Sequence, residues 1–464
     1  MPRTSRLPRN RGFEVARVLR RWGLGLLTVC WLAPPVIAEN WPQWRGPASS
    51  GVSSAENLPT IWSRTENLAW TAELSGLGAS SPIVWGELVF ATSQVGDARV
   101  APGGAHPQLA RDDAELAARE RAIGGRRPEA VAAEVFFVVE AFRLATGERV
   151  WQHRFAATGE LPAVHEKHNL ATPTPVTDGE RVYAWFGNGQ VVALELTGRE
   201  VWSRHLGEVA PFQNRWGHGS SPALFEDLLI LQVDHDAAAY LLALDKRTGA
   251  ERSKVEHEAG RERIAHSTPL VVPGPSGPEM VLNSGTRIEA YDPRTGALLW
   301  HAGQARQTPV PTPVFHDGVL YLARGYRNSD YQALRVGGRG DVTESHALWR
   351  SAGGASYVPS ILHHEGLVYV TNEIGVVTCA DATTGQALWR ERLGGVFFAS
   401  PVAGDGKVFL VSETGETWVL RAGRTAEAEV LAVNDLGERM LASPAVGGSR
   451  LILRSDGRLF AVGE

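Results

Sequence analysis

The sequence predicts an all-β fold, an eight-bladed β-propeller made of four-stranded antiparallel blades. The first observation is a proline that opens a short apolar strand and recurs eight times, at Pro82, Pro175, Pro222, Pro269, Pro313, Pro359, Pro401 and Pro444. After a first gap of 93 residues, these prolines lie 47, 47, 44, 46, 42 and 43 residues apart, a period typical of one propeller blade. The 464 residues therefore predict one closed array of repeats and not several unrelated domains.

A second repeated element, Thr-Gly-x-x-x-Trp, marks the outermost strand of a blade, and its copies end at Trp151, Trp202, Trp300 and Trp389. Glycine tolerates the positive φ of a tight turn. The tryptophan that follows is large enough to fill the space between neighbouring blades. Ser253 stands at this position in one repeat, and Trp349 follows a longer glycine-rich turn. We expect these tryptophans to be structural first.

The third observation is a turn between the first two strands of a blade, seen at Asp178-Gly179, Asp317-Gly318, Glu365-Gly366 and Asp405-Gly406. Alternating apolar residues flank each turn, as expected of a β-hairpin. In an up-and-down blade this hairpin and the Thr-Gly hairpin lie on the same face of the disc. That face is predicted to be plain scaffold.

The C-terminal repeat, residues 441–462, supplies only three strands. The segment 67–74 has the pattern of an outer strand, with Trp70 at its centre. We expect this segment to pair with the C-terminal strands, because closing the ring removes two exposed strand edges.

Residues 1–38 have the pattern of an export signal, with a basic region from Arg3 to Arg21, an apolar stretch, and Ala38 before the cleavage point. Pro34 and Pro35 interrupt the apolar stretch, so we expect a soluble periplasmic or secreted protein without a transmembrane span. A lipoprotein signal ending at Cys30 is the alternative, disfavoured by the bulky residue before this cysteine. Residues 39–66 then form an N-terminal extension, and residues 67–464 form the propeller.

Without residues 1–38 the chain keeps 39 basic and 50 acidic residues, a net charge of −11. This charge argues against nucleic acid or an anionic membrane as a partner. Cys379 is the only cysteine after residue 38, so no intramolecular disulfide can form in the mature chain. Because Cys379 stands where other repeats carry Ala193, Ala243 or Ala290, we expect a small buried side chain and not a nucleophile.

The element Ala-x-Asp-x-x-Thr-Gly-x-x-x-Trp resembles the signature of the PQQ-like, or quinoprotein alcohol dehydrogenase-like, propeller family, over residues 67–462. The chain is more similar to the shorter, BamB-like members than to the longer quinone dehydrogenases. This resemblance implies the propeller fold and says little about activity.

The face opposite the plain scaffold carries the loops before each proline and the hairpins between second and third strands, where the repeats differ. Residues that a scaffold does not need gather there, at the mouth of the central channel, which is the predicted binding site. The candidates are His165, His168, Asn169, Trp216, His218, His235, His266, Arg287, Arg324, Tyr326, Arg327, Tyr357, Asn372, Glu373, Glu413, Arg454 and Asp456. If Arg287, Arg324, Arg327 and Arg454 converge, they favour an anionic ligand.

An insertion in the first blade, residues 95–133, falls on the same face. Asp112 or Asp113 can cap a short helix that runs to Ile123, which predicts a lid over the channel. A disordered charged loop is the alternative.

Two further site types are considered for this face. His165, His168, His218 and His235, with Asp234, Asp236 and Glu166, are of the types that bind transition metals. Their spacing is not that of a helical His-Glu-x-x-His site, and hydrogen-bonded rim histidines are the expected case. The family resemblance also implies pyrroloquinoline quinone (PQQ) over calcium, for which Glu373, Asn372, Glu413, Asn283 and Asp456 offer oxygens. No motif assigns the family's ligands to any one of them, and the adjacent-cysteine disulfide often found beside the quinone cannot form.

The sequence contains no other catalytic template. It therefore favours an exported, monomeric binding or interaction scaffold that acts through its loop-rich face on an envelope protein or a small molecule. The alternative is a PQQ/calcium- or metal-dependent oxidoreductase with its site at the channel mouth. A carbohydrate-active or other small-molecule site at the same mouth is the third class.

Overall fold

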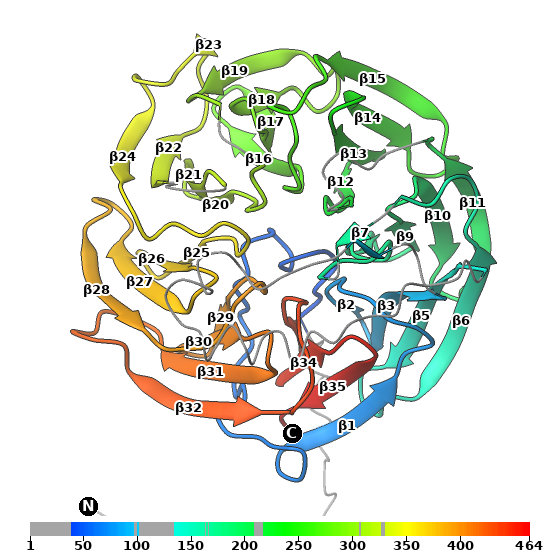
Figure 1. Cartoon of the computed structure of the whole chain (residues 1–464). Helices are drawn as coiled ribbons and strands as arrows, with labels where there is room; N and C mark the ends of the chain where they lie inside the picture. Colours follow the sequence, from blue (N-terminus) through cyan, green and yellow to red (C-terminus); the bar gives the residue numbers. More distant parts are fainter. Residues whose placement is uncertain are drawn as a thin grey trace, which may run out of the picture. The chain divides into compact units, whose positions relative to one another are not determined.

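Eight four-stranded antiparallel units follow one another around a ring (Figure 1). The computed structural model describes residues 39–96, 100–101, 134–162, 164–165, 167–207, 217–305, 308–325 and 330–464. These residues form strands and loops without a helix, and therefore contain no helix that could span a membrane. The predicted all-β eight-bladed propeller is confirmed.

Each blade runs from an inner strand at the channel to an outer strand at the perimeter. The first four blades are β2 (Ile83–Trp85), β3 (Leu88–Val95), β5 (Phe136–Arg143), β6 (Arg149–Ala156); β8 (Val176–Thr177), β9 (Arg181–Trp185), β10 (Gln190–Glu195), β11 (Glu200–His205); β12 (Ala223–Phe225), β13 (Leu228–Asp234), β14 (Ala239–Asp245), β15 (Glu251–His257); and β16 (Leu270–Gly274), β17 (Gly277–Asn283), β18 (Ile288–Tyr291), β19 (Leu298–Ala302). A short strand, β23 (Gly340–Asp341), adds to the outer edge of the fourth blade.

The remaining blades complete the ring. They are β20 (Val314–His316), β21 (Val319–Ala323), β22 (Tyr331–Arg335), β24 (Ala347–Ser351); β25 (Leu362–His364), β26 (Leu367–Thr371), β27 (Val376–Asp381), β28 (Ala387–Arg392); β29 (Val402–Gly404), β30 (Lys407–Val411), β31 (Glu416–Arg421), β32 (Val430–Asp435); and β33 (Ala445–Gly447), β34 (Arg450–Arg454), β35 (Arg458–Val462), β1 (Leu68–Glu73).

The eighth blade is closed by the N-terminal strand, as predicted. β1 pairs antiparallel with β35, with Trp70 opposite Ala461. The Trp70 indole is buried, and its Nε1–H donates to the Leu144 carbonyl of the first blade at 2.8 Å. An N-terminal strand thus completes the blade formed by the last three strands, and β35 is not left as an unpaired outer edge.

The outer tryptophans join neighbouring blades. Trp151 Nε1–H donates to the Leu196 carbonyl in the next blade at 2.7 Å. A Cβ on Gly198, in the next Thr-Gly turn, would lie 2.7 Å from the Trp151 ring, so the φ of +87° and the ring both require glycine there. Trp202 and Trp349 repeat the contact with Lys246 and Ala382. Ser253 occupies the tryptophan position of the third blade, opposite Ala243, and Cys379 lies buried at the alanine position of the sixth.

A belt of Ser and Thr hydroxyls surrounds the channel where each inner strand begins. In seven of the eight belt residues, from Ser81 to Ser400, the backbone N–H donates to the hydroxyl of the next blade at 2.8–3.1 Å. The accepting hydroxyls of this belt are those of Thr174, Ser221, Thr268, Thr312, Ser360, Ser400 and Ser443, and Ser81 begins the series. The belt therefore links consecutive blades at the channel wall, while the tryptophans link them at the perimeter.

The position of Pro359 differs from the one predicted from the proline repeat. Ser360 donates to Ser400 and accepts from Thr312, so Ser360 is the sixth member of the belt. Ile361 therefore occupies the position that Pro401 holds in the seventh blade, and Pro359 lies one residue before the belt. Proline is favoured at the start of a strand because its φ is fixed and its missing N–H is not needed there, but the position does not require it.

We expect Thr268→Val to destabilise the protein by about 2 kcal/mol, because the buried Ser221 N–H loses its acceptor while the side-chain shape is kept. Urea unfolding of both proteins measures the difference. Thr197→Val, at an exposed turn, is the matched control and is expected to change stability by less than about 0.5 kcal/mol. Equal effects of the two variants would contradict a structural role of the belt.

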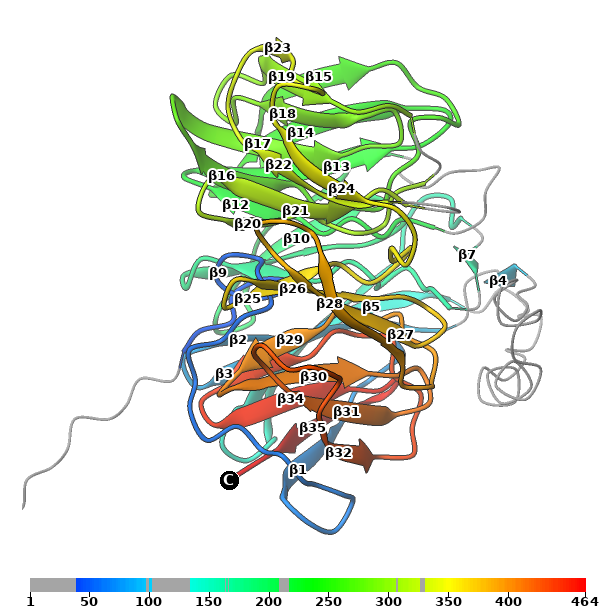
Figure 2. The ribbon, with the colours of Figure 1, turned by 90° about the vertical axis from the view of Figure 1, so that its left-hand side faces the viewer.

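The N-terminal extension crosses the channel on the face predicted to be plain scaffold (Figures 1 and 2). Trp41 forms a β-bridge with Val84 of the first blade, and Val52 forms one with Ala403 of the seventh. The Pro42 carbonyl accepts from the N–H of Thr177 in the second blade. The extension thus contacts inner strands on several sides of the channel and covers that end of it.

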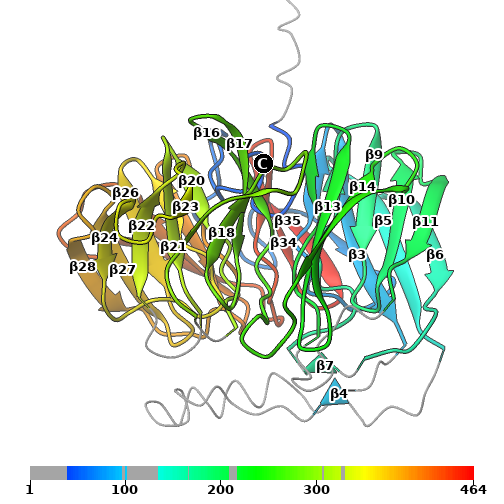
Figure 3. The ribbon, with the colours of Figure 1, turned by 90° about the horizontal axis from the view of Figure 1, so that it is seen from above.

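The described strand of the insertion in the first blade, β4 (Val100–Ala101), lies on the opposite face (Figure 3). It pairs in parallel with β7 (Val164–His165), in the loop between the first and second blades. Figures 2 and 3 show this pair beyond the face of the disc that is opposite to the N-terminal extension. The predicted helix between residue 112 and Ile123 lies outside the described residues.

Candidate functional site

The central channel holds a cavity of about 680 Å³, a size typical of small-molecule sites. The entry loops of all eight blades contribute to its wall, and Trp44 of the N-terminal extension contributes from the covered end. The lining residues are Trp44, Ala79, Ser81, His165, Lys167, His168, Thr172, Thr174, Gly219, Ser221, His266, Thr268, Thr308, Val310, Thr312, Tyr357, Val358, Phe398, Ser400, Leu441 and Ser443. Four of them, His165, His168, His266 and Tyr357, belong to the predicted set.

The three histidines of the wall are held neutral by burial. Burial lowers the pKa of His168 to about 3, with the nearby His266 and His165 adding to the effect. Burial also lowers the pKa of His266 to about 4 and that of His165 to about 4. The Nε2 atom of His266 is buried without a hydrogen-bond partner among the described residues. These rings therefore offer neutral donors or acceptors at pH 7.

Lys167 connects two sides of the mouth. Its Nζ lies 3.1 Å from Glu413 Oε2, at the edge of the seventh blade, and 4.2 Å above the Phe398 ring. Glu413 Oε1 also accepts from Arg439 Nε at 2.9 Å, and Arg439 Nη1 lies 3.5 Å from Asp456. Burial lowers the pKa of Lys167, and Glu413 opposes this shift. The predicted carboxylates Glu413 and Asp456 are thus engaged by cations of the protein.

Glu373 supports the wall from behind. Its Oε1 accepts the N–H groups of the lining residues Tyr357 and Val358, each at 2.6 Å. Burial raises the pKa of Glu373 to about 7. Its neighbour Asn372 accepts the N–H of Ile374 and of Val376 and so holds its own turn. Both residues orient the loops of the mouth.

Three further candidates lie beside the cavity. His218 packs on Trp185 with ring centroids 4.0 Å apart, His235 Nδ1 accepts the N–H groups of Ala237 and Ala238, and Asn169 Oδ1 accepts the N–H of Ala171. Among the described residues, no three or more His, Cys, Asp or Glu side chains form a group that could hold a metal ion. Glu166, one of the residues considered for metal binding, lies outside the described part of the chain.

The described arginines of the predicted set do not converge. Arg324 donates to Asn283 Oδ1 at 2.7 Å, Arg287 pairs with Glu289 at 3.0 Å, and Arg454 donates to the Thr92 carbonyl at 2.7 Å. Arg324 and Arg454 are buried and bond to the neighbouring blade, because a buried guanidinium needs acceptors close by. Arg287 is partly exposed and is held within the fourth blade. Arg327, with the candidates Trp216 and Tyr326, lies outside the described residues.

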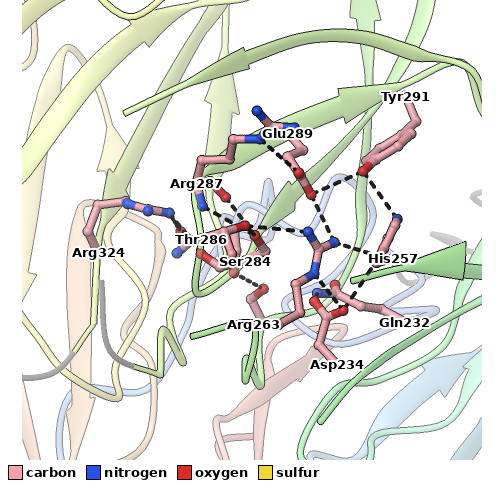
Figure 4. A network of polar contacts seen from close by, with 12 residues as sticks. Gln232, Asp234, His257, Arg263, Ser284, Thr286, Arg287, Glu289, Tyr291 and Arg324 are labelled. Carbon is pink, nitrogen blue, oxygen red and sulfur yellow. Dashed lines mark hydrogen bonds and ion pairs between the residues drawn. The ribbon is translucent and has the colours of Figure 1, made fainter. Parts of the chain in front are cut away.

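A buried ion network that the sequence analysis missed joins the third and fourth blades (Figure 4). Arg263 Nε lies 3.0 Å from Asp234 Oδ1, and its Nη2 lies 2.9 Å from Glu289 Oε2. The same Nη2 donates to His257 Nδ1 at 2.6 Å, so the His257 proton sits on Nε2 and points to the Tyr291 hydroxyl at 3.2 Å. The two carboxylates raise the pKa of Arg263. This network fixes the loop that carries His266.

The oxygens proposed for a quinone-bound calcium do not fit that task in this structure. Asn283 donates from Nδ2 to two backbone carbonyls, and its Oδ1 accepts from Arg324. Asn372 and Glu373 accept backbone N–H groups, and Glu413 is neutralised by Lys167 and Arg439. A calcium ion requires six to eight oxygens that are free to coordinate, and these oxygens are already engaged by the protein, so they do not fit a calcium site beside PQQ.

Comparison with known proteins identifies the family. The model of a family described as "Outer membrane protein assembly factor BamB" matches residues 136–373 and 286–463. The chain belongs to this PQQ-like propeller family. A curated BamB of Moranella endobia is 32% identical over 113 residues, which are 24% of this chain and 26% of that relative. The match thus spans about a quarter of the length of that relative.

Solved structures share the fold of this BamB-family chain. BamB from Moraxella catarrhalis has 17% identity and a TM-score of 0.52, with 72% of this chain and 92% of that chain covered. The quinohemoprotein alcohol dehydrogenase from Comamonas testosteroni has 12% identity and a TM-score of 0.58, with 92% and 81% covered. At these identities the likeness shows the propeller fold alone.

Proposed function

We propose that this BamB-family chain is an exported binding protein that holds its ligand, or an inserted segment of a partner, at the mouth of its central channel. The observation that carries the proposal is the cavity of about 680 Å³, lined by loops of every blade and covered at the other end by the N-terminal extension. The described carboxylates beside it serve the protein's own ion pairs and turns. This arrangement supports binding more than acid–base chemistry.

The envelope location is part of the proposal. It is supported by the signal-like pattern of residues 1–38 and by the names of the relatives, which are outer membrane protein assembly factors. A monomeric state remains a prediction, which the elution volume of the purified mature chain tests.

The binding role is tested by filling the cavity. Leu441 lines it, and we expect Leu441→Trp to reduce recovery of the bound molecule or partner at least about tenfold, because the indole occupies its space. The mature chain is purified from its native envelope without denaturant and analysed by native mass spectrometry. Val433→Trp, on the outer strand β32 and 47% exposed, is the matched control and is expected to behave as wild type.

Recovery of the same molecule from Leu441→Trp would contradict the proposal, as would wild-type protein that carries nothing. The oxidoreductase alternative has its own test, a titration of the mature chain with PQQ and calcium. Saturable binding together with dye reduction would replace a binding role with an enzymatic one.

A further inference from the structure

The wall of the cavity has an apolar side and a polar side. The apolar side comes from the loops that enter the sixth, seventh and eighth blades, with Tyr357, Val358, Phe398 and Leu441. The polar side comes from the loops that enter the second, fourth and fifth blades, and its hydrogen-bonding residues are His165, Lys167, His168, Thr172, His266 and Thr308. The second blade stands opposite the sixth, and the fourth stands opposite the eighth (Figure 1). The two sides therefore face each other across the channel.

The wall carries no net charge. None of the described lining residues is Asp or Glu, and Lys167 is the one cation among them. Its Nζ lies 3.1 Å from Glu413, which also pairs with Arg439, and Arg439 Nη1 lies 3.5 Å from Asp456. Two cations thus meet two carboxylates. The wall histidines are neutral at pH 7, because burial lowers each pKa to about 3 or 4. A charged ligand would leave water here without a counter-ion to receive it.

Two neighbouring residues of the polar side have no protein partner for their side chains. The His266 N–H donates to the Pro309 carbonyl at 2.9 Å, which brings His266 next to Thr308. Both residues are partly exposed, and neither side chain forms a hydrogen bond within the described residues. His266 Nε2 is enclosed, so Nδ1 is the ring nitrogen left for a ligand. It lies on the side of Gly219, another lining residue, where a Cβ would be 3.7 Å away.

The backbone of Thr308 is strained. Its φ is +47°, a left-handed conformation that β-branched residues rarely adopt. Within the described part of the chain, Thr308 is the only β-branched residue with a positive φ. Glycine would adopt this conformation at a lower cost, so the strain indicates that the side chain serves a purpose there. Because Thr308 lines the cavity beside His266, that purpose is best explained by ligand binding.

We propose that the cavity binds a neutral polyhydroxylated molecule, a mono- or disaccharide, whose hydroxyls bond to His266 and Thr308 and whose C–H face packs on the apolar side. A sugar hydroxyl is both donor and acceptor, so it satisfies a neutral imidazole as well as a threonine hydroxyl. An entirely apolar ligand would exclude water from these two side chains and leave them without a partner. Tyr357 and Phe398 offer the large apolar surfaces that the C–H face requires. This inference rests on the proposed binding function and names its ligand class.

The first test compares neutral sugars with their charged counterparts. Isothermal titration calorimetry of the mature chain is carried out with glucose, galactose, mannose, N-acetylglucosamine, maltose and cellobiose. We expect saturable binding of at least one of them. The uronate and the amino sugar that correspond to the best binder should bind at least about tenfold more weakly, because the wall has no free counter-ion for either charge.

The second test uses Thr308. Thr308→Val keeps the branched shape and removes the hydroxyl, so we expect the saccharide affinity to fall at least about threefold at an unchanged melting temperature. Thr308→Gly should lower the affinity as much and raise the melting temperature of the ligand-free protein, because the strain is relieved. Asp317→Gly is the matched control, since Asp317 has a φ of +44° at an exposed turn and does not line the cavity. This control should leave the affinity unchanged.

The opposite results overturn the inference. If none of these saccharides binds, the ligand class is wrong, and recovery of another molecule from the native envelope would still leave the proposed binding function standing. A charged counterpart that binds as tightly as the neutral sugar would contradict a neutral site. Unchanged saccharide affinity of both Thr308 variants would make Thr308 a purely structural residue. If neither variant folds, the comparison of neutral with charged sugars on the wild type still decides.

Discussion

Arg263→Leu is expected to destabilise the protein by about 3 to 5 kcal/mol, since it leaves two buried carboxylates without their shared cation. Asp234 and Glu289 are both buried and lie 3.0 and 2.9 Å from the guanidinium. Leucine fills part of the space and restores none of the hydrogen bonds. Urea unfolding at pH 7 measures the loss.

The matched control is Arg294→Leu. Arg294 pairs with Glu226 on the surface, where both side chains are more than half exposed, and exposed pairs contribute about 0 to 1 kcal/mol. A triple variant, Arg263→Leu with Asp234→Asn and Glu289→Gln, should recover part of the loss because no buried charge remains. Equal effects of Arg263→Leu and Arg294→Leu would show that the network does not hold the third and fourth blades together.

The fold could be predicted from the sequence because each blade is specified locally. Alternating apolar residues recur in each repeat, and a turn glycine with a tryptophan four residues later recurs in four of them, with little dependence on the other repeats. Even the closure by residues 67–74 was visible, since Trp70 carries the outer-strand pattern. Pro359 is the one repeat proline that does not follow a belt residue directly. The repeat therefore depends on the belt hydroxyl more than on the proline.

The site could be predicted only in part because it is assembled from distant segments. His165, His168 and His266 were found because polar residues in variable loops stand out from the repeat. Lys167 pairs with a carboxylate 246 residues away, and no local pattern reveals such a partner. Charged residues near the mouth therefore looked free in sequence although the fold had already paired them.

Trp44, which lines the covered end of the cavity, had no repeat signature at all. It lies in the N-terminal extension, outside every blade, and the face that this extension covers was expected to be plain scaffold. Seven of the eight belt residues were visible as Ser or Thr directly before a repeat proline, but a hydroxyl that recurs in every blade indicates the fold before it indicates a site. Their position around one axis is a property of the closed ring.

The second large expected effect is a dependence of the folding stability on pH. The two buried histidines of the cavity wall and the buried Glu373 contribute to it in opposite directions. His168 and His266 have folded pKa values lowered to about 3 and about 4, below the usual 6.5. As pH falls below 6.5, these two histidines bind protons in the unfolded chain but stay neutral in the folded protein. The free energy of unfolding therefore decreases. Between pH 8 and pH 4.5 this loss of unfolding free energy is about 2 to 3 kcal/mol for each histidine. The double variant His168→Gln, His266→Gln is expected not to show this loss.

Glu373 changes the folding stability with pH in the direction opposite to the histidines. Its folded pKa is raised to about 7, so the folded state keeps a proton that the unfolded chain loses above about 4.5. The stability that this proton supplies is present at pH 4.5 and is lost as pH rises through 7. Glu373→Gln, whose amide oxygen can still accept from Tyr357 and Val358, should therefore gain about 3 kcal/mol relative to wild type between pH 4.5 and pH 8.

Urea unfolding of the three proteins at both pH values separates these effects, because carboxylates elsewhere titrate equally in all of them and cancel in the differences. Relative to wild type, the histidine variant should be more stable at pH 4.5 than at pH 8, and Glu373→Gln should be more stable at pH 8 than at pH 4.5. Differences that do not change with pH, or that change in the same direction for both variants, would contradict the burial of these groups. The opposite pH dependences of the two stability differences therefore test whether the mouth loops are packed, and this test does not require the ligand to be known.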